Sequence, residues 1–369
     1  MKPALLFICF VLCIKSFSQD QKKSRNIFII TTDGFRWEEL FQGADKELVC
    51  NNKFVKDTGL TKDLFWDTTA DLRRKKLMPF FWNVIAKRGQ IYGNRQLASK
   101  VNVKNLYKIS YPGYGEIFTG LADLKPILNW PVLKRNTSIF EYLNAQPSFE
   151  GKVVAFTSWS IMPFILNEPR CRFSVNSGYE MLNYQNEGGD VIDSLQKMVY
   201  RKGKTRQDQL TYLSAKEYIE QFRPKALFLG LGETDEYAHD GHYDMYLQKA
   251  AAVDKMIADL WYYLQTDPFY KDNTTLIITT DHGRGKKGAA WRRHGFWVRG
   301  SGEVWLAILG PEILPFGEMT ATPQIWQKQI AATAALLVGE HFKPSFHSGS
   351  PISIPGFGEL QSKYAVNTK

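Results

Sequence analysis

The chain has 369 residues, with 44% hydrophobic and 23% charged side chains, four cysteines and a formal charge of +10. This composition is typical of a globular protein, and it excludes disordered, collagen-like, coiled-coil and disulfide-scaffold classes. The positive excess makes a polyanion a candidate partner, although net charge concerns solubility and steering rather than a particular site.

The first 19 residues, MKPALLFICFVLCIKSFSQ, have the organisation of a secretory signal peptide. Lys2 gives a positive start, the run from Ala4 to Ile14 is apolar, and small and polar residues follow from Ser16 onward. The run is too short for a stable membrane span, and no later segment reaches about 18 consecutive apolar residues. We therefore expect a secreted or periplasmic protein with no membrane span in its mature chain. An N-terminal anchor or a buried strand is the alternative.

Cleavage after residue 19 would lower the formal charge to +8 and leave two cysteines, Cys50 and Cys171. In an oxidising compartment these two could form one disulfide, which their sequence positions do not settle. Two thiols exclude a cysteine-rich zinc site.

Short apolar runs rich in β-branched residues alternate with helical patterns along the mature chain. The predicted strands are Asn26–Thr32, Lys152–Thr157, Ala226–Leu231, Thr274–Thr280 and Val304–Leu309. The predicted helices are Pro79–Arg88, Ser138–Ala145, Asp208–Phe222, Tyr243–Thr266 and Pro323–Val338, the last with a first-turn proline and Gly339 after its end. The strands lack clean alternation, as expected for parallel strands covered on both faces, so the pattern predicts an α/β sheet.

Two stretches, residues 42–76 and 160–205, are polar, aromatic and irregular, and fit this alternation poorly. We interpret them as cap-like insertions over the sheet rather than as separate domains, because the chain shows no repeat and no linker. Residues 20–369 are therefore expected to form one domain.

Acidic and imidazole side chains collect just after three of the predicted strands, where α/β proteins place their sites. In chain order they are Asp33, Asp235, His239, Asp281, His282 and, further along, His294. Carboxylate oxygens and imidazole nitrogens at this density suit Zn²⁺. Alone, Asp33 would more simply be a helix cap or an Asx turn, and Asp281-His282-Gly283 a turn. The joint order is what favours a metal site.

The best candidate nucleophile is Ser110, in the segment SYPGYGEIFTG. It precedes a turn rich in proline and glycine that leads into an apolar segment, and a helix N-terminus behind it would favour an anion. A metal-bound hydroxyl loses its proton readily, so no histidine base is required. The simpler alternative is an ordinary Ser-Pro turn.

These motifs resemble the alkaline phosphatase superfamily, and within it the nucleotide pyrophosphatase/phosphodiesterase branch. Residues 33–36 match the D-G-F-R of that branch, and residues 110–120 are similar to its nucleophile segment T-F-P-N-H-Y-S-I-V-T-G, with serine for threonine. Residues 233–239 match E-P-D-x-x-x-H, residues 281–283 match D-H-G, and residues 294–295 match the closing H-G.

The resemblance implies a three-layer sandwich with a central, mostly parallel sheet, helices on both faces and cap-like insertions. It also implies two zinc ions, or another divalent metal. One ion would be held by Asp235, His239 and His294, and the other by Asp33, Asp281, His282 and the Ser110 oxygen. Ser110 would attack phosphorus in line and form a phosphoseryl intermediate.

The chain departs from the branch beside the nucleophile. Gly113 and Tyr114 replace the Asn-His pair of the family. An asparagine that contacts the phosphoryl oxygen in the branch has only a weak counterpart here, Asn129, at a different spacing. The sulfatase signature requires arginine where Tyr114 stands, which argues against sulfatase chemistry. Cofactor-independent phosphoglycerate mutase, a cytosolic relative, fits the signal peptide poorly.

The sequence thus predicts a two-metal phosphoric-ester hydrolase, most simply a phosphodiesterase of small or oligomeric esters, without a stable nucleic-acid complex. Phosphomonoesterases of the superfamily need extra cations, for which Arg36, Lys104 and Lys108 are candidates. A sulfatase-like hydrolase or a non-catalytic binder of anionic polymers are weaker alternatives. The basic clusters at residues 73–76 and 292–293 are solvated faces in the simplest interpretation, although Arg292-Arg293 adjoins His294 and could attract an anionic substrate.

Overall fold

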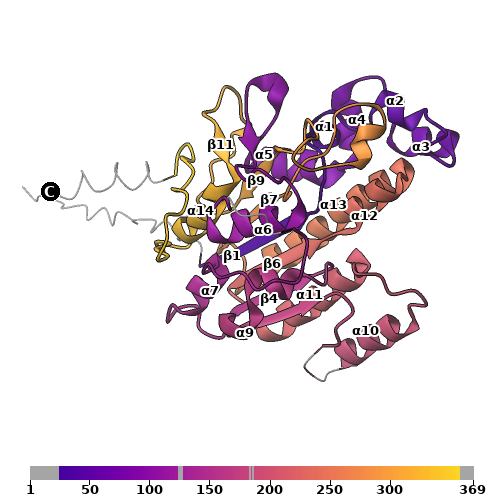
Figure 1. Ribbon diagram of the computed structural model, residues 1–369. Helices are drawn as coiled ribbons and strands as arrows, with labels where there is room; N and C mark the ends of the chain where they lie inside the picture. The colour runs from indigo at the N-terminus through magenta and orange to yellow at the C-terminus, as the bar shows by residue number, and fades with distance from the viewer. Residues whose placement is uncertain (1–24, 124–127, 183, 185–186, 358–369) are drawn as a thin grey trace, which may run out of the picture.

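An eight-stranded sheet in the order β10-β2-β9-β7-β1-β6-β4-β5 forms the centre of the computed structural model (Figure 1). The structure describes residues 25–123, 128–182, 184 and 187–357, so the predicted signal peptide lies outside the described residues. The strands are β1 (Asn26–Thr32), β2 (Gln90–Tyr92), β3 (Val101–Asn102), β4 (Val153–Thr157), β5 (Ser174–Ser177), β6 (Ala226–Leu231), β7 (Thr274–Thr279), β8 (Glu303–Val304), β9 (Leu306–Leu309), β10 (Gly317–Glu318) and β11 (Ile325–Trp326).

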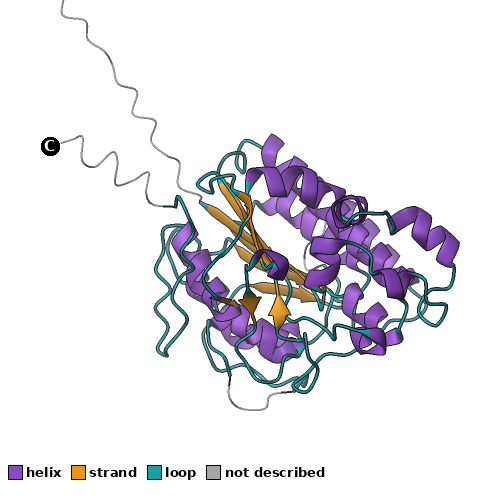
Figure 2. Ribbon diagram, turned by 90° about the horizontal axis from the view of Figure 1, so that it is seen from above, coloured by secondary structure: helices purple, strands orange, loops and turns teal. Residues whose placement is uncertain are grey.

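Helices lie on both faces of this sheet (Figure 2). The α-helices are α1 (Trp37–Gln42), α2 (Lys46–Val49), α3 (Thr58–Phe65), α4 (Ala70–Leu77), α5 (Ala86–Arg88), α6 (Ser110–Thr119), α7 (Ile139–Asn144), α8 (Met162–Leu166), α9 (Glu168–Cys171), α10 (Glu187–Met198), α11 (Asp208–Phe222), α12 (Glu233–Asp240), α13 (Tyr243–Thr266) and α14 (Ile330–Leu337). Shorter turns of other helix types are η1 (Phe81–Ile85), η2 (Arg95–Leu97), η3 (Gly288–Arg292) and η4 (Gln327–Gln329).

The central strand β1 is buried on both faces and divides two hydrophobic cores. Phe28 and Ile30 pack into the core beneath α11 and α13, whereas Ile27 and Ile29 pack into the core beneath α6, α7 and α14. Because successive side chains of a strand point to opposite faces, both faces need apolar residues, and the run cannot alternate with polar ones. This explains the continuous apolar pattern and confirms the expected α/β class. Only β9, among the described strands of the sheet, runs antiparallel to its neighbours β2 and β7.

Two of the predicted strands have the expected bounds, and the others differ at their ends. β4 and β7 are each one residue shorter than predicted. The run predicted as one strand at 304–309 is broken at Trp305. β8 pairs with β3 in a separate three-stranded sheet, while β9 belongs to the main sheet, so one apolar run serves two sheets.

The helices predicted at 208–222 and 243–266 are observed with those bounds. The prediction of a helix from Pro323 is wrong at its start, because α14 begins only at Ile330. Ile325 and Trp326 instead form β11, which pairs with β3. Strand pairing therefore prevails over helical periodicity at the start of this stretch. At its end, Gly339 follows the helix with a φ of 81°, as expected of a glycine that terminates a helix.

The two stretches predicted as irregular insertions contain regular elements. The first holds α2, α3 and α4, whose N-termini are capped by the side chains of Asp45, Asp57 and Thr69. The second holds α8, α9, α10 and also β5, which pairs with β4 as the edge strand of the main sheet. In Figure 1 the first group and α10 project at separate corners of the molecule.

Cys50 is exposed and Cys171 is buried, and both are free thiols, so the open question of a disulfide is answered in the negative. Among the described residues, no helix combines the length and the apolar character that crossing a membrane would require.

Candidate metal centre

The acidic side chains of the candidate site lie at one edge of the sheet, after the parallel strands β1, β6 and β7. β1 lies between β6 and β7, with Thr32 opposite Leu231 and Thr31 opposite Thr279. The three strands therefore end at about the same level of the sheet. The residues that follow these strands, Asp33, Asp235 and Asp281, therefore meet beyond the carboxyl ends of the strands.

Asp33, Asp281 and His282 form the first candidate metal set. Their donor atoms lie within 4.8 Å of one another, and His282 Nε2 is 3.5 Å from a carboxylate oxygen of each aspartate. Asp33 Oδ1 and Asp281 Oδ2 are buried and accept no hydrogen bond from the described residues. Buried carboxylate oxygens without a donor are costly, and a divalent cation would satisfy them. The donor set thus fits a metal of the kind that the resemblance implies.

Ser110 lies at this first set. Its Oγ is 3.3 Å from His282 Nε2, and the residue is buried as the first residue of α6. The expected proline- and glycine-rich turn is therefore the start of a helix. Pro112 is tolerated there, because a first-turn N–H has no intrahelical partner. Gly113 is required by packing, since a Cβ at this position would lie 2.5 Å from the carbonyl oxygen of Asp281.

Asp235, His239 and His294 form the second candidate set. Asp235 and His239 are four residues apart on α12, which places them on one helix face, with 3.0 Å between His239 Nε2 and Asp235 Oδ2. His294 Nε2 lies 3.0 Å from His239 Nε2 and 3.7 Å from Asp235 Oδ1. The His294 and His282 rings stack at 3.8 Å, so the two sets adjoin. Asp235 with His282 and His294 also satisfies the geometry of a metal site.

Burial shifts the pKa values of these groups. Burial, followed by repulsion from Asp281 and Asp235, raises the pKa of Asp33, and burial also raises the pKa of Asp281 to about 7. Burial lowers the pKa of His282 to about 4 and that of His294 well below its usual value. Burial acts to raise the pKa of Asp235, but Arg284 and the neighbouring imidazoles outweigh it and hold this pKa low. The lowered pKa values keep the two imidazoles neutral, as metal binding requires. The raised pKa values of Asp33 and Asp281 mean that a metal ion would displace protons from this pair on binding.

Hydrogen bonds orient the imidazoles and carboxylates from behind. His282 Nδ1 lies 2.9 Å from the carbonyl oxygen of Gly283, which leaves Nε2 free to face the aspartates. Tyr114 donates from its hydroxyl to Asp33 Oδ2 over 3.0 Å. The residue that departs from the family motif thus orients a proposed ligand. Such supporting bonds fix ligand geometry in metal sites.

Two positioning residues were not predicted from the sequence. Arg284 is buried and forms an ion pair with Asp235. Asp208 accepts hydrogen bonds from the N–H groups of Gly232 and Glu233, at 2.8 and 3.1 Å, and so fixes the start of α12. Arg284 follows the Asp-His-Gly motif directly, and a charged residue within a glycine-rich, otherwise buried motif is the one signal that could have singled it out. Asp208 stands 24 residues before its partner and carries no such signal.

A hollow of about 210 Å³ opens beside Ser110 and both metal sets. Asn129 lines it, and its Oδ1 accepts a hydrogen bond from the Tyr111 N–H at 2.9 Å. The weak candidate Asn129 is therefore brought to the first turn of α6, next to Ser110. Trp159 and Ile161 form an apolar wall of the same hollow.

Comparisons with known proteins support the fold and the metal chemistry. Residues 172–290 match the family model described as the metalloenzyme superfamily. The alkaline phosphatase PafA has a TM-score of 0.59 to this chain at 10% identity, covering 89% of this chain and 98% of that chain. The lipoteichoic acid synthase LtaP from Listeria monocytogenes has a TM-score of 0.58 at 11% identity, covering 89% and 75%. A 2-O GAG sulfatase has a TM-score of 0.54 at 12% identity, covering 91% and 75%.

At these identities the likeness shows the fold alone, and no curated protein matches the sequence. The alkaline phosphatase-like fold that the sequence resemblance implied is confirmed. The phosphodiesterase branch is not distinguished, because the similar structures include a phosphatase, a synthase and a sulfatase.

Proposed function

We propose that this chain, with its alkaline phosphatase-like fold, is a metal-dependent phosphoric-ester hydrolase that prefers phosphodiesters and uses Ser110 as its nucleophile. The observation that carries the proposal is the position of Ser110 Oγ, 3.3 Å from His282 Nε2 at the N-terminus of α6. A hydroxyl in this place adjoins the unpartnered carboxylate oxygens of Asp33 and Asp281. No arrangement of this kind is needed by a protein that only binds anions.

The residues fit two divalent ions, for which we propose zinc. Asp33, Asp281, His282 and the Ser110 oxygen would hold one. Asp235, His239 and His294 would hold the other. When bound, the ions supply positive charge to the phosphoryl oxygens, the nucleophile and the leaving oxygen. Carboxylate and imidazole ligands of this number are those that zinc and related divalent metals take.

The chain's own groups position the ester and the nucleophile. Ser110 Oγ would form a bond to phosphorus while the bond from phosphorus to the leaving oxygen breaks, and water would then release the phosphoserine by the same displacement. The hydroxyl proton passes to solvent, and the leaving oxygen takes a proton from it. The N-terminus of α6 behind Ser110 favours the developing negative charge. The Tyr111 N–H donates to Asn129 Oδ1, which holds Asn129 beside Ser110.

The lining of the hollow favours a diester over a monoester. A diester has one unshielded negative oxygen fewer, and its second ester group needs an apolar surface rather than a cation. Trp159 and Ile161 provide that surface, and Lys204 is the one cation among the described residues lining the hollow. Of the three cations suggested by the sequence, Arg36 is buried against Glu39 and Gly285, and Lys104 lies over the Trp326 ring. Lys108 is not among the residues that line the hollow.

A serine-to-alanine exchange tests the proposal. Ser110→Ala is expected to abolish turnover of bis(p-nitrophenyl) phosphate, because the bond to phosphorus cannot form, while about two metal ions per chain remain bound by metal analysis. The wild type should hydrolyse this diester faster than p-nitrophenyl phosphate or p-nitrophenyl sulfate. Ser194→Ala, on the exposed face of α10, is the matched control. Unchanged turnover in Ser110→Ala would refute the nucleophile.

We also propose that the protein is secreted or periplasmic, on the basis of its first 19 residues. Fractionation of expressing cells, with N-terminal sequencing of the product, tests this. Recovery of an uncleaved chain in the cytosolic fraction would contradict it.

A further inference from the structure

The loop that follows His282 and carries His294 has an unusual concentration of positive charge. Residues 283–302 contain six arginines and lysines and no acidic residue. Three of these six have structural partners: Arg284 pairs with Asp235, Arg292 donates to the carbonyl oxygen of His239, and Lys286 pairs with Glu303. The other three are Lys287, Arg293 and Arg299, for which the described part of the chain supplies no ion pair.

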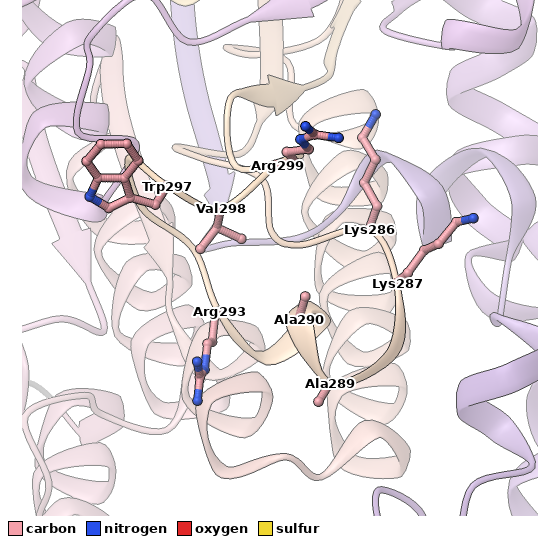
Figure 3. A pocket seen from close by; sticks show the side chains of 8 residues that line it. All are labelled: Lys286, Lys287, Ala289, Ala290, Arg293, Trp297, Val298 and Arg299. Carbon is pink, nitrogen blue, oxygen red and sulfur yellow. The ribbon is translucent and has the colours of Figure 1, made fainter.

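These three unpaired cations surround one cavity of about 710 Å³. Figure 3 shows Arg293 and Trp297 on one side of it, Lys286 and Lys287 on the other, and Val298 and Ala290 between them. A volume of this size is within the range of ligand sites. Trp297 is 89% exposed, so its ring is available to a ligand rather than to the core.

The cavity shares a wall with the metal centre. Arg293 has an extended backbone, with φ −120° and ψ 151°, and its carbonyl oxygen accepts a hydrogen bond from Gly285 N–H at 2.9 Å. In extended chain, neighbouring side chains point to opposite sides, so Arg293 faces the cavity while His294 faces the metal sets. A single backbone segment therefore separates the cavity from the metal sets.

The basic cluster at residues 73–76, in contrast, has partners within the protein for its positive charges. In α4, Arg73 donates to the carbonyl oxygen of Gln42, Arg74 pairs with Glu318, and Lys75 pairs with Asp71. Lys287, Arg293 and Arg299 lack such partners among the described residues and repel one another, which costs free energy that a bound anion would recover.

We propose that this cavity binds further anionic groups of the substrate, so that the preferred substrate is a polyanionic phosphodiester with several units rather than a single ester. This inference rests on the proposed function and deepens it. Lys287, Arg293 and Arg299 pair with the phosphates or other anions of the distal units, and Trp297 provides a face for a ring in one of them.

A pair of substrates with the same leaving group tests the proposal. One is the p-nitrophenyl ester of thymidine 5′-phosphate, and the other is this ester extended at its 3′ side by four thymidylates. The wild type is expected to show a higher kcat/KM for the extended ester. In the variant Lys287→Gln/Arg293→Gln/Arg299→Gln, the ratio of the two kcat/KM values at low salt should fall about tenfold, because the tail loses three charge contacts.

A variant with the same charge change elsewhere is the control. Lys197, Lys255 and Lys271 are exposed and lie on α10, on α13 and after α13. Their triple exchange to glutamine removes the same net charge and should leave the ratio unchanged. An equal fall in the control would assign the effect to the overall field of the protein and overturn the proposal. An unchanged ratio in the cavity variant would overturn it as well.

Binding without turnover separates this inference from the proposed function. In the Ser110→Ala background, the anisotropy of a fluorescein-labelled pentathymidylate gives Kd at several salt concentrations. Loss of the three cavity cations should lower the slope of log Kd against log salt by about two. Trp297→Ala should weaken the pentathymidylate several-fold but leave inorganic polyphosphate, which has no ring, unaffected. If neither ester is hydrolysed by the wild type, the proposed function fails, while these titrations still decide for or against the cavity.

Discussion

Arg284 connects both halves of the second metal set. Its Nε donates to the carbonyl oxygen of Trp291 at 2.9 Å, its Nη2 to that of Arg292 at 2.8 Å, and its remaining nitrogen meets Asp235. The guanidinium therefore fixes one carboxylate oxygen of Asp235 and the segment that leads to His294. The other oxygen of Asp235 is left to face His239.

We expect Arg284→Met to weaken zinc binding by about tenfold to a hundredfold, the usual cost of removing a group that orients a ligand. Two opposing effects act here. The positive charge repels a metal ion, but its removal also leaves two buried carbonyl oxygens without a donor and Asp235 without its anchor, and this loss should prevail. Competition against a chelator of known affinity measures the result.

Arg284→Lys distinguishes the two effects, because it keeps the charge and loses the two carbonyl contacts. It should bind zinc more weakly than the wild type. Tighter binding by Arg284→Met, with wild-type binding by Arg284→Lys, would mean that repulsion is the dominant effect of this arginine.

At the scale of whole elements, Asp254 ties α13 to the start of η1. Its carboxylate accepts hydrogen bonds from the N–H groups of Phe80 and Phe81, at 2.7 and 2.8 Å. Burial nevertheless raises the pKa of Asp254 to about 7, since the two backbone donors compensate only in part. The folded state thus holds a proton on Asp254 at pH values where the unfolded chain has lost it.

Between about pH 4 and pH 7 this group should therefore make the free energy of unfolding decrease as pH rises. The slope contributed is at most 2.303RT per pH unit, the value for one proton. Asp254→Asn should remove that contribution, so the difference between wild type and variant should depend on pH in this window and be constant above it. Urea unfolding at several pH values, with chelator present throughout, measures both curves. Parallel curves from pH 5 to pH 7 would show that Asp254 titrates normally.

The central strands β1, β4, β6 and β7 could be predicted from sequence because each buries both faces and is therefore largely apolar. The short strands β2, β3, β5, β10 and β11 were not predicted. The clustering of the candidate ligands could be predicted because they follow strands that proved to be adjacent, as Asp33 and Asp281 do. The start of α6 was not predicted at Ser110, because the pair Pro112-Gly113 is typical of a turn. Gly113 is needed because it packs against Asp281, which is distant in sequence. Arg284 was missed for the same reason, because its partner Asp235 is 49 residues away. Pairings between distant segments leave little trace in local patterns.

At the scale of the molecule, negative and positive charges are concentrated in two adjacent regions. Asp33, Asp235 and Asp281 are gathered in one buried or partly buried cluster, whereas the loop 283–302 beside them carries the six basic residues. The carboxylates attract metal ions, and the basic loop favours anions near them. The basic excess of the sequence is thus partly local to the site, and it suits the approach of a phosphate ester better than a distributed positive surface would.

The cost of the carboxylate cluster should appear in the stability of the whole protein. Asp281→Asn keeps an oxygen that can accept the Gly34 N–H, which is 3.0 Å from Asp281 Oδ1. It also removes a buried charge whose second oxygen, Oδ2, accepts no hydrogen bond from the described residues. In the presence of chelator at pH 8, we therefore expect the variant to be at least as stable as the wild type in thermal unfolding. With excess zinc the order should reverse, because each site stabilises the wild type by about 2.7 kcal/mol at a metal concentration a hundred times its Kd. A wild type that is more stable than the variant in chelator, and that gains nothing from zinc, would mean that this cluster is satisfied within the protein and holds no metal.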